Sequence, residues 1–433
     1  MLLALVASAR AQLLGFVQSD EAQFLASYAE LTADSYSAPL PPALTSACAA
    51  KGPAYSGVAA ELPAAVLTAA QTTAAAAQAA CTDAICVVPA GLTLTLDGSV
   101  DVGALIVRGA VRWDDATQTA PQQWLCAGYV AVEPGGLFNL TVLNSEAFVY
   151  IKDNSAYHPQ LATQTCAGGG ADGADGPCPP LGVRAFGGVG STIEVAGRPL
   201  RRTWSLLAKP AAVGSTSLSL LHDPAAMGWR LGDRIMVAPT TRASSGTAEA
   251  FTIGAFGIGN VVELASADGQ FGGATAQTFA AEARASGSGG GVALLSAEVI
   301  NLRRSVVITG DDFSQVSCSS FSTTATTCTM GLHTAMMARG GLLRMQHARV
   351  ERCGQRGVLG KYCIHLHLIA SCPACVVRGN AVERSMQRGL IIHGTHQSLV
   401  EANVFADVRG ANLYIEDGNE MYNRVLHLSL IHI

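Results

Sequence analysis

The chain has 433 residues, of which 49% are hydrophobic and only 14% are charged, so it can bury a large core and is not intrinsically disordered. Its formal net charge is −5 and its Lys and Arg residues are scattered, which argues against a nucleic-acid partner. No apolar run reaches about 18 residues, so the sequence predicts no membrane-spanning helix.

The N-terminal part shows two compositional features and no catalytic motif. Residues 1–11 combine a short apolar run with an Ala-Arg-Ala step and resemble a signal peptide. Residues 19–81 are rich in Ala and are interrupted by the prolines at 39–42. We therefore expect a short Ala-rich leader that is helical or disordered.

From Cys86 onward the pattern changes to short alternating segments that end in Gly or Asp-Gly turns. VVPAGLTLTLDG, VGALIVRGAVRW and GYVAVEPGGLFNLTV follow one another in this way. Alternation of this kind indicates many short strands, so we expect an all-β fold. Asp97, Asp114 and Asp115 at strand ends are candidates for an ion or for turns. The four tryptophans are candidates for sugar stacking or, with more weight, for core packing; they are Trp113, Trp124, Trp204 and Trp229.

The last third of the sequence contains an internal repeat. Residues 350–357 (VERCGQRG) recur as residues 382–389 (VERSMQRG), and a looser copy ends at Arg409. The last two copies are 21 residues apart, and the first two are 32 apart because residues 361–375 carry an insertion. A period of just over about twenty residues is that of one coil of a right-handed parallel β-helix. Asn380 and Asn403 occupy matching positions, where stacked amides can hydrogen-bond from coil to coil.

The twelve cysteines predict disulfides and an extracellular location. Four pairs bracket short loops: Cys81/Cys86, Cys166/Cys178, Cys318/Cys328 and Cys372/Cys375. A zinc site at the last pair lacks a second pair of ligands in sequence. The sequon at Asn139 is a candidate glycosylation site.

Polar residues gather at the ends of the predicted coils. In CIHLHL, a period of two places Ile364, Leu366 and Leu368 inside and both His365 and His367 outside. Aligning the apolar ends of the next two coils stacks three residues in a column, with three more beside it. The column is His367, His393 and Glu416, and the flanking residues are His396, Asp417 and Glu420.

Adjacent coils lie about 4.8 Å apart, so such a column brings imidazoles and carboxylates within hydrogen-bond or metal-ligand reach. That chemistry suits acid/base catalysis of glycoside hydrolysis, or binding of a divalent ion whose identity the sequence leaves open. The candidate catalytic residues are Glu416, Asp417, His393 and His396. The candidate substrate-binding residues are Arg388, Arg409, His365, His367 and Glu420. The alternative is a purely structural ladder with an Asp-Gly turn.

These residues resemble a known family, the G8-domain proteins with a parallel β-helix, which include the cell-migration-inducing hyaluronidase, its transmembrane relative and the fibrocystin-like proteins. The matching segments include SAEVINLRRSVVITGD, GKYCIHLHL, RGLIIHGTHQSLVEANV and NLYIEDGNEMYN. The resemblance implies a G8-like domain at residues 82–197 and a β-helix at residues 198–433. It also implies an extracellular protein. The hyaluronidase branch is described as cleaving hyaluronan with a calcium requirement, and the fibrocystin branch has no settled activity.

We therefore expect an extracellular protein that binds a hyaluronan-like polysaccharide at the column and is a candidate to hydrolyse it, with calcium as the candidate cofactor. Two alternatives stay open: a non-catalytic adhesion or receptor ectodomain, and a calcium-dependent lyase in which Arg388 meets a substrate carboxylate. The last recognisable coil ends close to residue 433, so we expect further coils beyond it.

Overall fold

The computed structural model describes residues 40–50, 54–159, 161–166, 175–240, 248–265, 273–285, 292–318 and 326–431. The expected signal peptide at residues 1–11 lies outside these ranges. Two short helices occur in them, α2 (Pro42–Cys48) and α3 (Ala74–Cys81), and α3 falls in the Ala-rich run. Neither described helix is long and apolar enough to cross a membrane.

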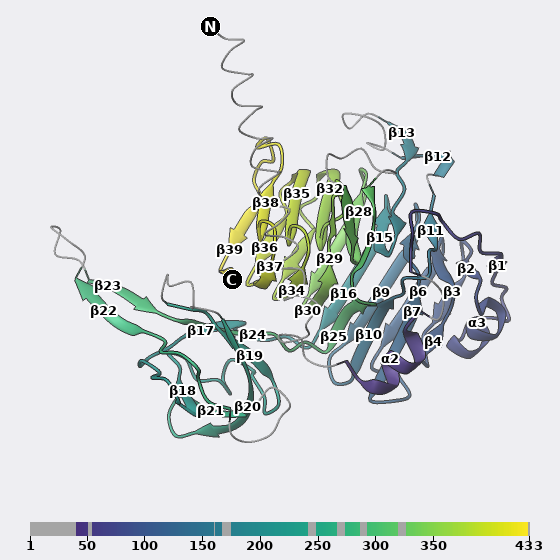
Figure 1. Ribbon diagram of the computed structural model, residues 1–433. Coiled ribbons are helices and arrows are strands. Elements are labelled where there is room, and N and C mark those ends of the chain that lie inside the picture. Colours follow the sequence, from purple (N-terminus) through teal and green to yellow (C-terminus); the bar gives the residue numbers. More distant parts are fainter. Residues whose placement is uncertain are drawn as a thin grey trace, which may run out of the picture. The chain divides into compact units, whose positions relative to one another are not determined.

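Three long parallel sheets make up most of the structure (Figure 1). Sheet 1 runs in the order β1 (Ala64–Val66), β2 (Ile85–Val88), β5 (Ala104–Val107), β8 (Val130–Val132), β15 (Ala185–Val189), β28 (His333–Met337), β32 (Ile364–Ser371), β35 (Leu390–His396), β38 (Leu413–Ile415). Sheet 2 runs β4 (Val100–Asp101), β7 (Gln122–Ala127), β10 (Glu146–Ile151), β25 (Val306–Gly310), β30 (Ala348–Cys353), β34 (Ala381–Ser385), β37 (Val404–Val408), β40 (Ser429–Leu430). Sheet 3 runs β3 (Thr93–Thr95), β6 (Ala110–Asp114), β9 (Leu137–Val142), β16 (Thr192–Gly197), β29 (Leu342–Gln346), β33 (Val376–Arg378), β36 (Leu399–Glu401), β39 (Arg424–Leu426).

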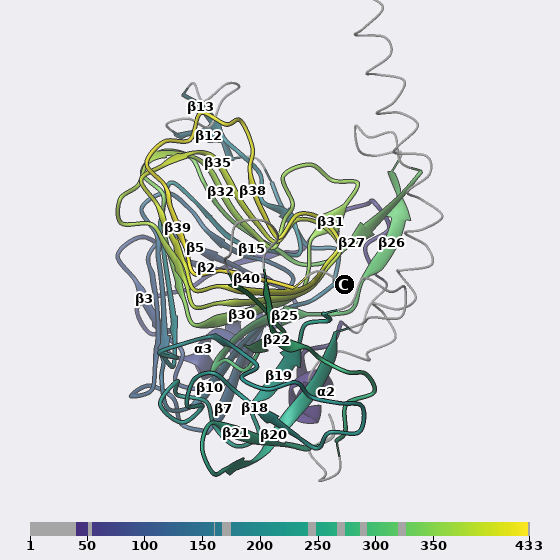
Figure 2. The same cartoon turned by 90° about the vertical axis from the view of Figure 1, so that its left-hand side faces the viewer.

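One core fills the space between the three sheets. Each coil contributes one strand to every sheet, and in Figure 2 the coils overlap along the stack. Inward-facing aliphatic and aromatic residues, among them Val107, Trp113, Phe138, Ile308 and Leu366, form this single buried cluster. Because alternate residues of each strand face inward, the short alternating segments read in the sequence suffice to build it. The expected parallel β-helix is confirmed.

Left-handed backbone recurs at two stacked places in the coils. One set, Arg352, Arg384 and Asp407 with φ between 51° and 55°, lies within neighbouring strands of sheet 2, close to their ends. Another stacks His347, Gly379, Ala402 and His427, all with positive φ, directly after strands of sheet 3. A non-glycine residue there costs about 1–2 kcal/mol, so most of these positions are held against a local backbone preference.

The predicted repeat has the predicted register. Val350 pairs with Val382 and Glu351 with Glu383 in parallel strands of sheet 2. The amide of Asn380 donates to Asn403 Oδ1 at 2.9 Å, and both side chains are buried. The repeat is therefore one coil, and the asparagine ladder exists.

The structure draws the domain boundaries differently from the expected division at residue 197. Strand β15 pairs in parallel with β8 before it and with β28 after it, so residues 82–197 lie in the same stack of coils as the C-terminal part. Within the region expected to be β-helix, residues 204–301 instead contribute to a six-stranded antiparallel sheet with its own core. Its order is β17 (Trp204–Leu206), β24 (Glu298–Asn301), β19 (Arg234–Val237), β20 (Glu249–Gly257), β21 (Val261–Ala265), β18 (Ser217–Ser219).

Smaller sheets are formed by loops between coils. They are β11 (Tyr157–His158) with β14 (Gly182–Val183), β12 (Leu161–Cys166) with β13 (Gly176–Cys178), β22 (Ala281–Ala285) with β23 (Val292–Ser296), and β26 (Ser314–Ser317) with β27 (Thr327–Met330) and β31 (Gln355–Arg356).

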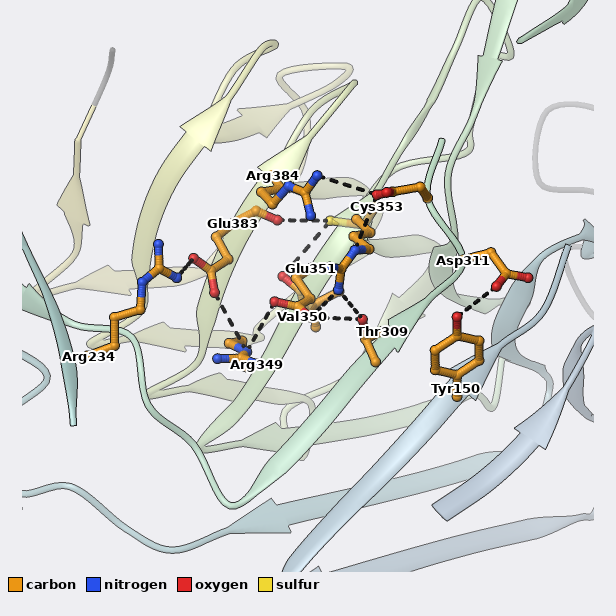
Figure 3. A network of polar contacts seen from close by, with 12 residues as sticks. Tyr150, Arg234, Thr309, Asp311, Arg349, Val350, Glu351, Cys353, Glu383 and Arg384 are labelled. Carbon is orange, nitrogen blue, oxygen red and sulfur yellow. Dashed lines mark hydrogen bonds and ion pairs between the residues drawn. The ribbon is translucent and has the colours of Figure 1, made fainter. Parts of the chain in front are cut away.

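A buried ladder of charges follows the outside of sheet 2 (Figure 3). Glu383 accepts from Arg234 of the antiparallel sheet at 2.9 Å and lies 3.6 Å from Arg349. Glu351 accepts from Thr309 and from Arg352 at 2.8 and 2.9 Å. Burial raises the pKa of the Glu351 carboxyl, but the neighbouring arginines outweigh it and the pKa is lowered overall. Such a ladder is costly to break, because removing one member leaves a buried charge unpaired.

All twelve cysteines form disulfides. The four predicted pairs are present, and the pair Cys372–Cys375 excludes a zinc site there. Two pairs were not predicted, Cys48–Cys126 across 78 residues and Cys353–Cys363 between coils.

Candidate functional site

The predicted column lies on the outer side of sheet 1, at its C-terminal end. His367 of β32 is the register partner of His393 of β35. Ile392 pairs with Ile415 of β38, and the amide of Glu416 donates to the Ile392 carbonyl at 3.0 Å. The alignment of His367, His393 and Glu416 inferred from the apolar ends of the coils is therefore present.

His365 lies on the outer side of the sheet but is not exposed, contrary to the sequence prediction. Its side chain is only 1% exposed, because the ring packs edge-on to Tyr362 and stacks parallel to His393. A turn just before β32 supplies this cover. A period of two shows which side of a sheet a residue faces, but it does not show what covers that side.

The alternation also ends earlier than predicted. Leu368 has a φ of 53°, and the pairing of β32 with β35 shifts register between His367 and Ala370. As a result Ile369, rather than Leu368, belongs to the core. The expected inward position of Leu368 is wrong, because a bulge resets the alternation.

Three imidazoles meet at the centre of the site. His367 Nδ1 lies 3.0 Å from His393 Nδ1, and the ring centroids of His365 and His367 are 4.7 Å apart. His365 Nδ1 lies 2.9 Å from the Gly360 carbonyl oxygen, whereas His365 Nε2 is buried without a hydrogen-bond partner. Burial lowers the pKa of His365 well below 6.5, and neighbouring His367 lowers it further. Burial, then His393 and Lys361, lower the pKa of His367 to about 4, so both rings are neutral at physiological pH.

Two carboxylates contact the outermost ring of the trio. Asp417 Oδ2 lies 3.1 Å from His393 Nε2, and Glu416 Oε2 lies 3.6 Å from His393 Nδ1. The Asp417 side chain is 45% exposed, whereas those of Glu416 and His393 are 21% exposed. One imidazole thus lies between two acids at the surface, an arrangement that can orient the ring or exchange protons with a bound substrate.

Two further predicted residues hold the loop that carries Asp417. Glu420 Oε1 accepts from the backbone N–H of Gly394 at 3.0 Å and of Asp417 at 3.2 Å. Burial raises the pKa of Glu420, but these backbone donors outweigh it and lower the pKa overall. His396 Nδ1 accepts from the Met421 amide at 2.9 Å. The contacts of Glu420 and His396 are therefore those of positioning residues.

The two predicted arginines are placed differently from one another. Arg388 donates to the Tyr362 hydroxyl at 2.9 Å, lies over the Tyr414 ring at 4.3 Å, and is 3.9 Å from Glu416. Arg409 lies 3.5 Å from Asp407 of β37, a strand of sheet 2. Arg388 is thus part of the site, and the described contact of Arg409 belongs to another face of the coil.

A cavity of ≈ 630 Å³ opens beside the outermost imidazole, a size that suits a small ligand or part of a polymer. It is lined by Leu368, His393, Gly394, His396, Asp417, Asn419 and Met421.

The calcium ion implied by the family resemblance does not match the centre of this site. Ca²⁺ takes about 6–8 oxygen ligands, whereas the donor atoms that converge here are imidazole nitrogens.

The contacts of the other residues singled out in the sequence are those of turns, helix caps, strands and core packing. Asp97 accepts from the Ala74 amide at the start of α3, and Asp115 accepts from three consecutive backbone amides, so both serve turns or caps. Trp113 and Trp229 are buried in the two cores. Asn139 lies on β9 and its amide donates to Glu194 at 3.2 Å, so its glycosylation stays a prediction.

The residues missed in the sequence immediately precede CIHLHL. The Gly360 carbonyl, Lys361 and Tyr362 surround His365, and Lys361 Nζ donates to the Leu181 carbonyl at 2.7 Å. Burial lowers the pKa of Lys361 to about 8. Tyr362, an aromatic residue directly before the segment CIHLHL, was the signal in the sequence that could have revealed the cover over His365.

Fold, register and column together define a parallel β-helix with a histidine and acid site on one face. Residues 329–430 match the family model described as CEMIP beta-helix, and this range contains the whole column. The chain is thus similar to the G8-domain and CEMIP-like parallel β-helix proteins, as the resemblance predicted.

Particular relatives fall into both branches of that group. Mouse Fibrocystin-L is 29% identical over 280 residues, which are 57% of this chain and 6% of the relative. A G8 domain-containing protein of Dictyostelium discoideum is 27% identical over 234 residues, 54% of this chain and 18% of the relative. Human Cell surface hyaluronidase CEMIP2 is 26% identical over 144 residues, 31% of this chain and 10% of the relative. The chain thus spans less than a fifth of the length of these relatives.

Proposed function

We propose that this protein binds an extracellular polysaccharide on the outer face of its last coils and hydrolyses it there. The observation that carries the proposal is the contact of His393 with Asp417 at 3.1 Å beside the ≈ 630 Å³ cavity. The match to the CEMIP beta-helix model supports it, because residues 329–430 include both side chains. Six disulfides support an oxidising, extracellular environment.

In this proposal the exposed carboxylate and the ring act together. Asp417, the more exposed acid, removes the proton of an attacking water, and His393 orients that carboxylate through its Nε2–H. Glu416, on the Nδ1 side of the same ring, is the second carboxyl group that glycoside hydrolysis requires. It gives a proton to the glycosidic oxygen as the bond from that oxygen to the anomeric carbon breaks and the water oxygen bonds to that carbon. Arg388, stacked over Tyr414, presents a cationic surface to an acidic sugar.

The second candidate function is a non-catalytic adhesion ectodomain. It is favoured by the similarity to Fibrocystin-L, which covers more of this chain than the similarity to the hyaluronidase does. In that case the column binds a glycan or stays structural, and the acids carry no proton.

The test is incubation of the purified chain with size-defined hyaluronan, other glycosaminoglycans and bacterial polysaccharides, with and without calcium. We expect retention on one polymer and a fall in its chain length. In Asp417→Asn the cleavage rate should fall at least about 100-fold with binding retained. In His393→Gln the cleavage rate should fall by a similar factor, and the circular dichroism spectrum should be unchanged. Arg424→Gln, an exposed residue of sheet 3, is the matched control.

Each outcome separates the candidates. Binding of a polymer whose length never changes would overturn hydrolysis and leave the adhesion function. A product with a new ultraviolet absorbance would select the lyase. Failure to retain any polymer would remove glycan binding altogether.

A further inference from the structure

The three imidazoles at the centre of the site have a feature that acid/base chemistry does not use. In the described part of the chain, His365, His367 and His393 form the group of candidate ligands whose donor atoms all lie within 4.8 Å of one another. They come from two neighbouring strands, β32 and β35, which the coil register holds together.

The tautomer of His365 follows from its contacts. A carbonyl oxygen can only accept, so the 2.9 Å contact with Gly360 requires the proton on Nδ1. His365 Nε2 therefore carries a lone pair. That atom is buried without a partner, and leaving a buried acceptor unsatisfied costs about 1–3 kcal/mol.

The contacts of His393 point to one tautomer in the same way. Asp417 at 3.1 Å from Nε2 accepts that proton, which leaves the lone pair on Nδ1. This Nδ1 lies 3.0 Å from His367 Nδ1. A hydrogen bond from His367 would satisfy the pair, yet it would leave the buried nitrogen of His365 without a donor.

A metal ion satisfies all three nitrogens at once. Two ligands on one tetrahedral Zn²⁺, at about 2.0–2.1 Å each, lie a little over about 3 Å apart, close to the observed separation of the two Nδ1 atoms. Metal-bound histidines almost always donate their other N–H to a backbone carbonyl or a carboxylate. His365 does so to Gly360, and His393 does so to Asp417.

We propose that His365 Nε2, His367 Nδ1 and His393 Nδ1 bind one divalent transition-metal ion of the zinc type, rather than calcium. Imidazole ligands suit Zn²⁺, Cu²⁺, Ni²⁺ and Fe²⁺, whereas Ca²⁺ prefers oxygen. Three protein ligands leave a further coordination position, as in catalytic zinc sites and unlike closed structural ones. The inference of the ion rests on this geometry alone, and only its use on a sugar rests on the proposed function.

The experiment uses the full chain after treatment with a chelator, followed by titration with ZnCl₂ and, separately, CoCl₂. Calorimetry and metal analysis should give one tightly bound ion per chain, and Co²⁺ should give the visible absorption of a low-coordinate nitrogen site. CaCl₂ should not compete. His365→Phe and His393→Gln should each weaken Zn²⁺ binding at least about 100-fold, and Asp417→Asn about 10–100-fold.

His427→Gln is the matched control, because that exposed histidine lies at the corner directly after β39, a strand of sheet 3, away from the three imidazoles. It should bind Zn²⁺ as the unchanged chain does. Unfolding in urea shows whether each variant is folded, and His367→Gln replaces any variant that is not. The proposed site is overturned if the unchanged chain does not bind one Zn²⁺ ion. It is also overturned if the folded His365→Phe and His393→Gln variants bind Zn²⁺ as tightly as the unchanged chain does. Polysaccharide retention is measured on the same samples, so a failed metal site and a failed glycan function are told apart.

Discussion

The two halves of sheet 1 share one register but differ in chemistry. One outer column runs through Ile106, Ala131, Gly187 and Ala335 and then reaches His365. In the first half these positions are apolar or glycine and pack against the loop that carries Cys166, Cys178 and Leu181. At Gly187 a side chain would meet the Ala335 carbonyl at 2.6 Å and Leu181 at 3.0 Å. In the second half the same face carries imidazoles and acids beside a cavity. The coil thus determines where each outward-facing residue lies. The type of residue at that place determines whether it packs against a loop or contributes to the polar site.

The largest expected effect comes from placing a charge in the apolar half. Ala131→Asp would bury a carboxylate without a partner at a position that is 0% exposed. We expect a loss of about 3 kcal/mol or more in the free energy of unfolding, measured with urea. Asn419→Asp, on the exposed loop of the second half, should change it by less than about 0.5 kcal/mol. Equal effects of the two variants would contradict the comparison.

Acid should destabilise the fold through His347, a partly buried histidine at the corner that follows β29 of sheet 3. Burial, with Arg304 and Arg378, lowers the pKa of His347 to about 4, whereas an unfolded histidine titrates near about 6.5. Between these values the unfolded chain binds a proton that the folded chain does not. The free energy of unfolding therefore falls as the pH falls from about 6.5 to 4, by up to about 3 kcal/mol from this group.

Urea midpoints at several pH values, compared for the unchanged chain and His347→Gln, check this expectation. The variant should show a flatter decline over that range. The variant of the exposed His427, His427→Gln, should keep the pH dependence of the unchanged chain. If His347→Gln also showed the same pH dependence as the unchanged chain, His347 would not carry the effect.

A smaller effect is expected at the cationic edge of the site. Arg388→Lys keeps the charge but loses the planar contact with Tyr414 and the bond to Tyr362, which should weaken polysaccharide binding about 3–10-fold. Arg424→Lys, with an exposed side chain on sheet 3, should leave it unchanged. Binding isotherms at fixed salt distinguish the two variants.

The smallest effect concerns the corners that both halves need. Ala402 has a φ of 55°, so Ala402→Gly removes an unfavourable left-handed alanine but loosens the unfolded chain. The net expectation is a gain of about 0.5–1 kcal/mol in the free energy of unfolding. Ala348→Gly, within a strand of sheet 2, should instead lose about as much, and the same sign for both variants would argue against strain at the corner.

The sequence was sufficient for the coil register because the repeat and the asparagine ladder are local, periodic signals. The pairing of Val350 with Val382 and of His367 with His393 could be derived by aligning apolar ends. The burial of His365 could not, because it depends on a turn that folds over the outer face. The insertion of an antiparallel sheet was also missed, since a short alternating strand has the same pattern whether its neighbour runs parallel or antiparallel.

The disulfides likewise divide into pairs that the sequence predicts and pairs that it does not. Pairs that bracket short loops follow from spacing, whereas Cys48–Cys126 joins residues 78 positions apart and needs the fold to be known. The roles assigned to Glu416, Asp417 and His393 stay predictions for the experiments above.

The distribution of the site over successive coils makes it modular. His367 and His393 are 26 residues apart in the chain yet 3.0 Å apart in space, because each occupies an equivalent place on its own coil. Inserting one coil between these two neighbouring coils would leave the hydrophobic core continuous but separate the two histidines, and deleting one of the two coils would remove one member of the site. Repeat number is therefore a route by which this architecture can acquire or lose chemistry without a change of fold.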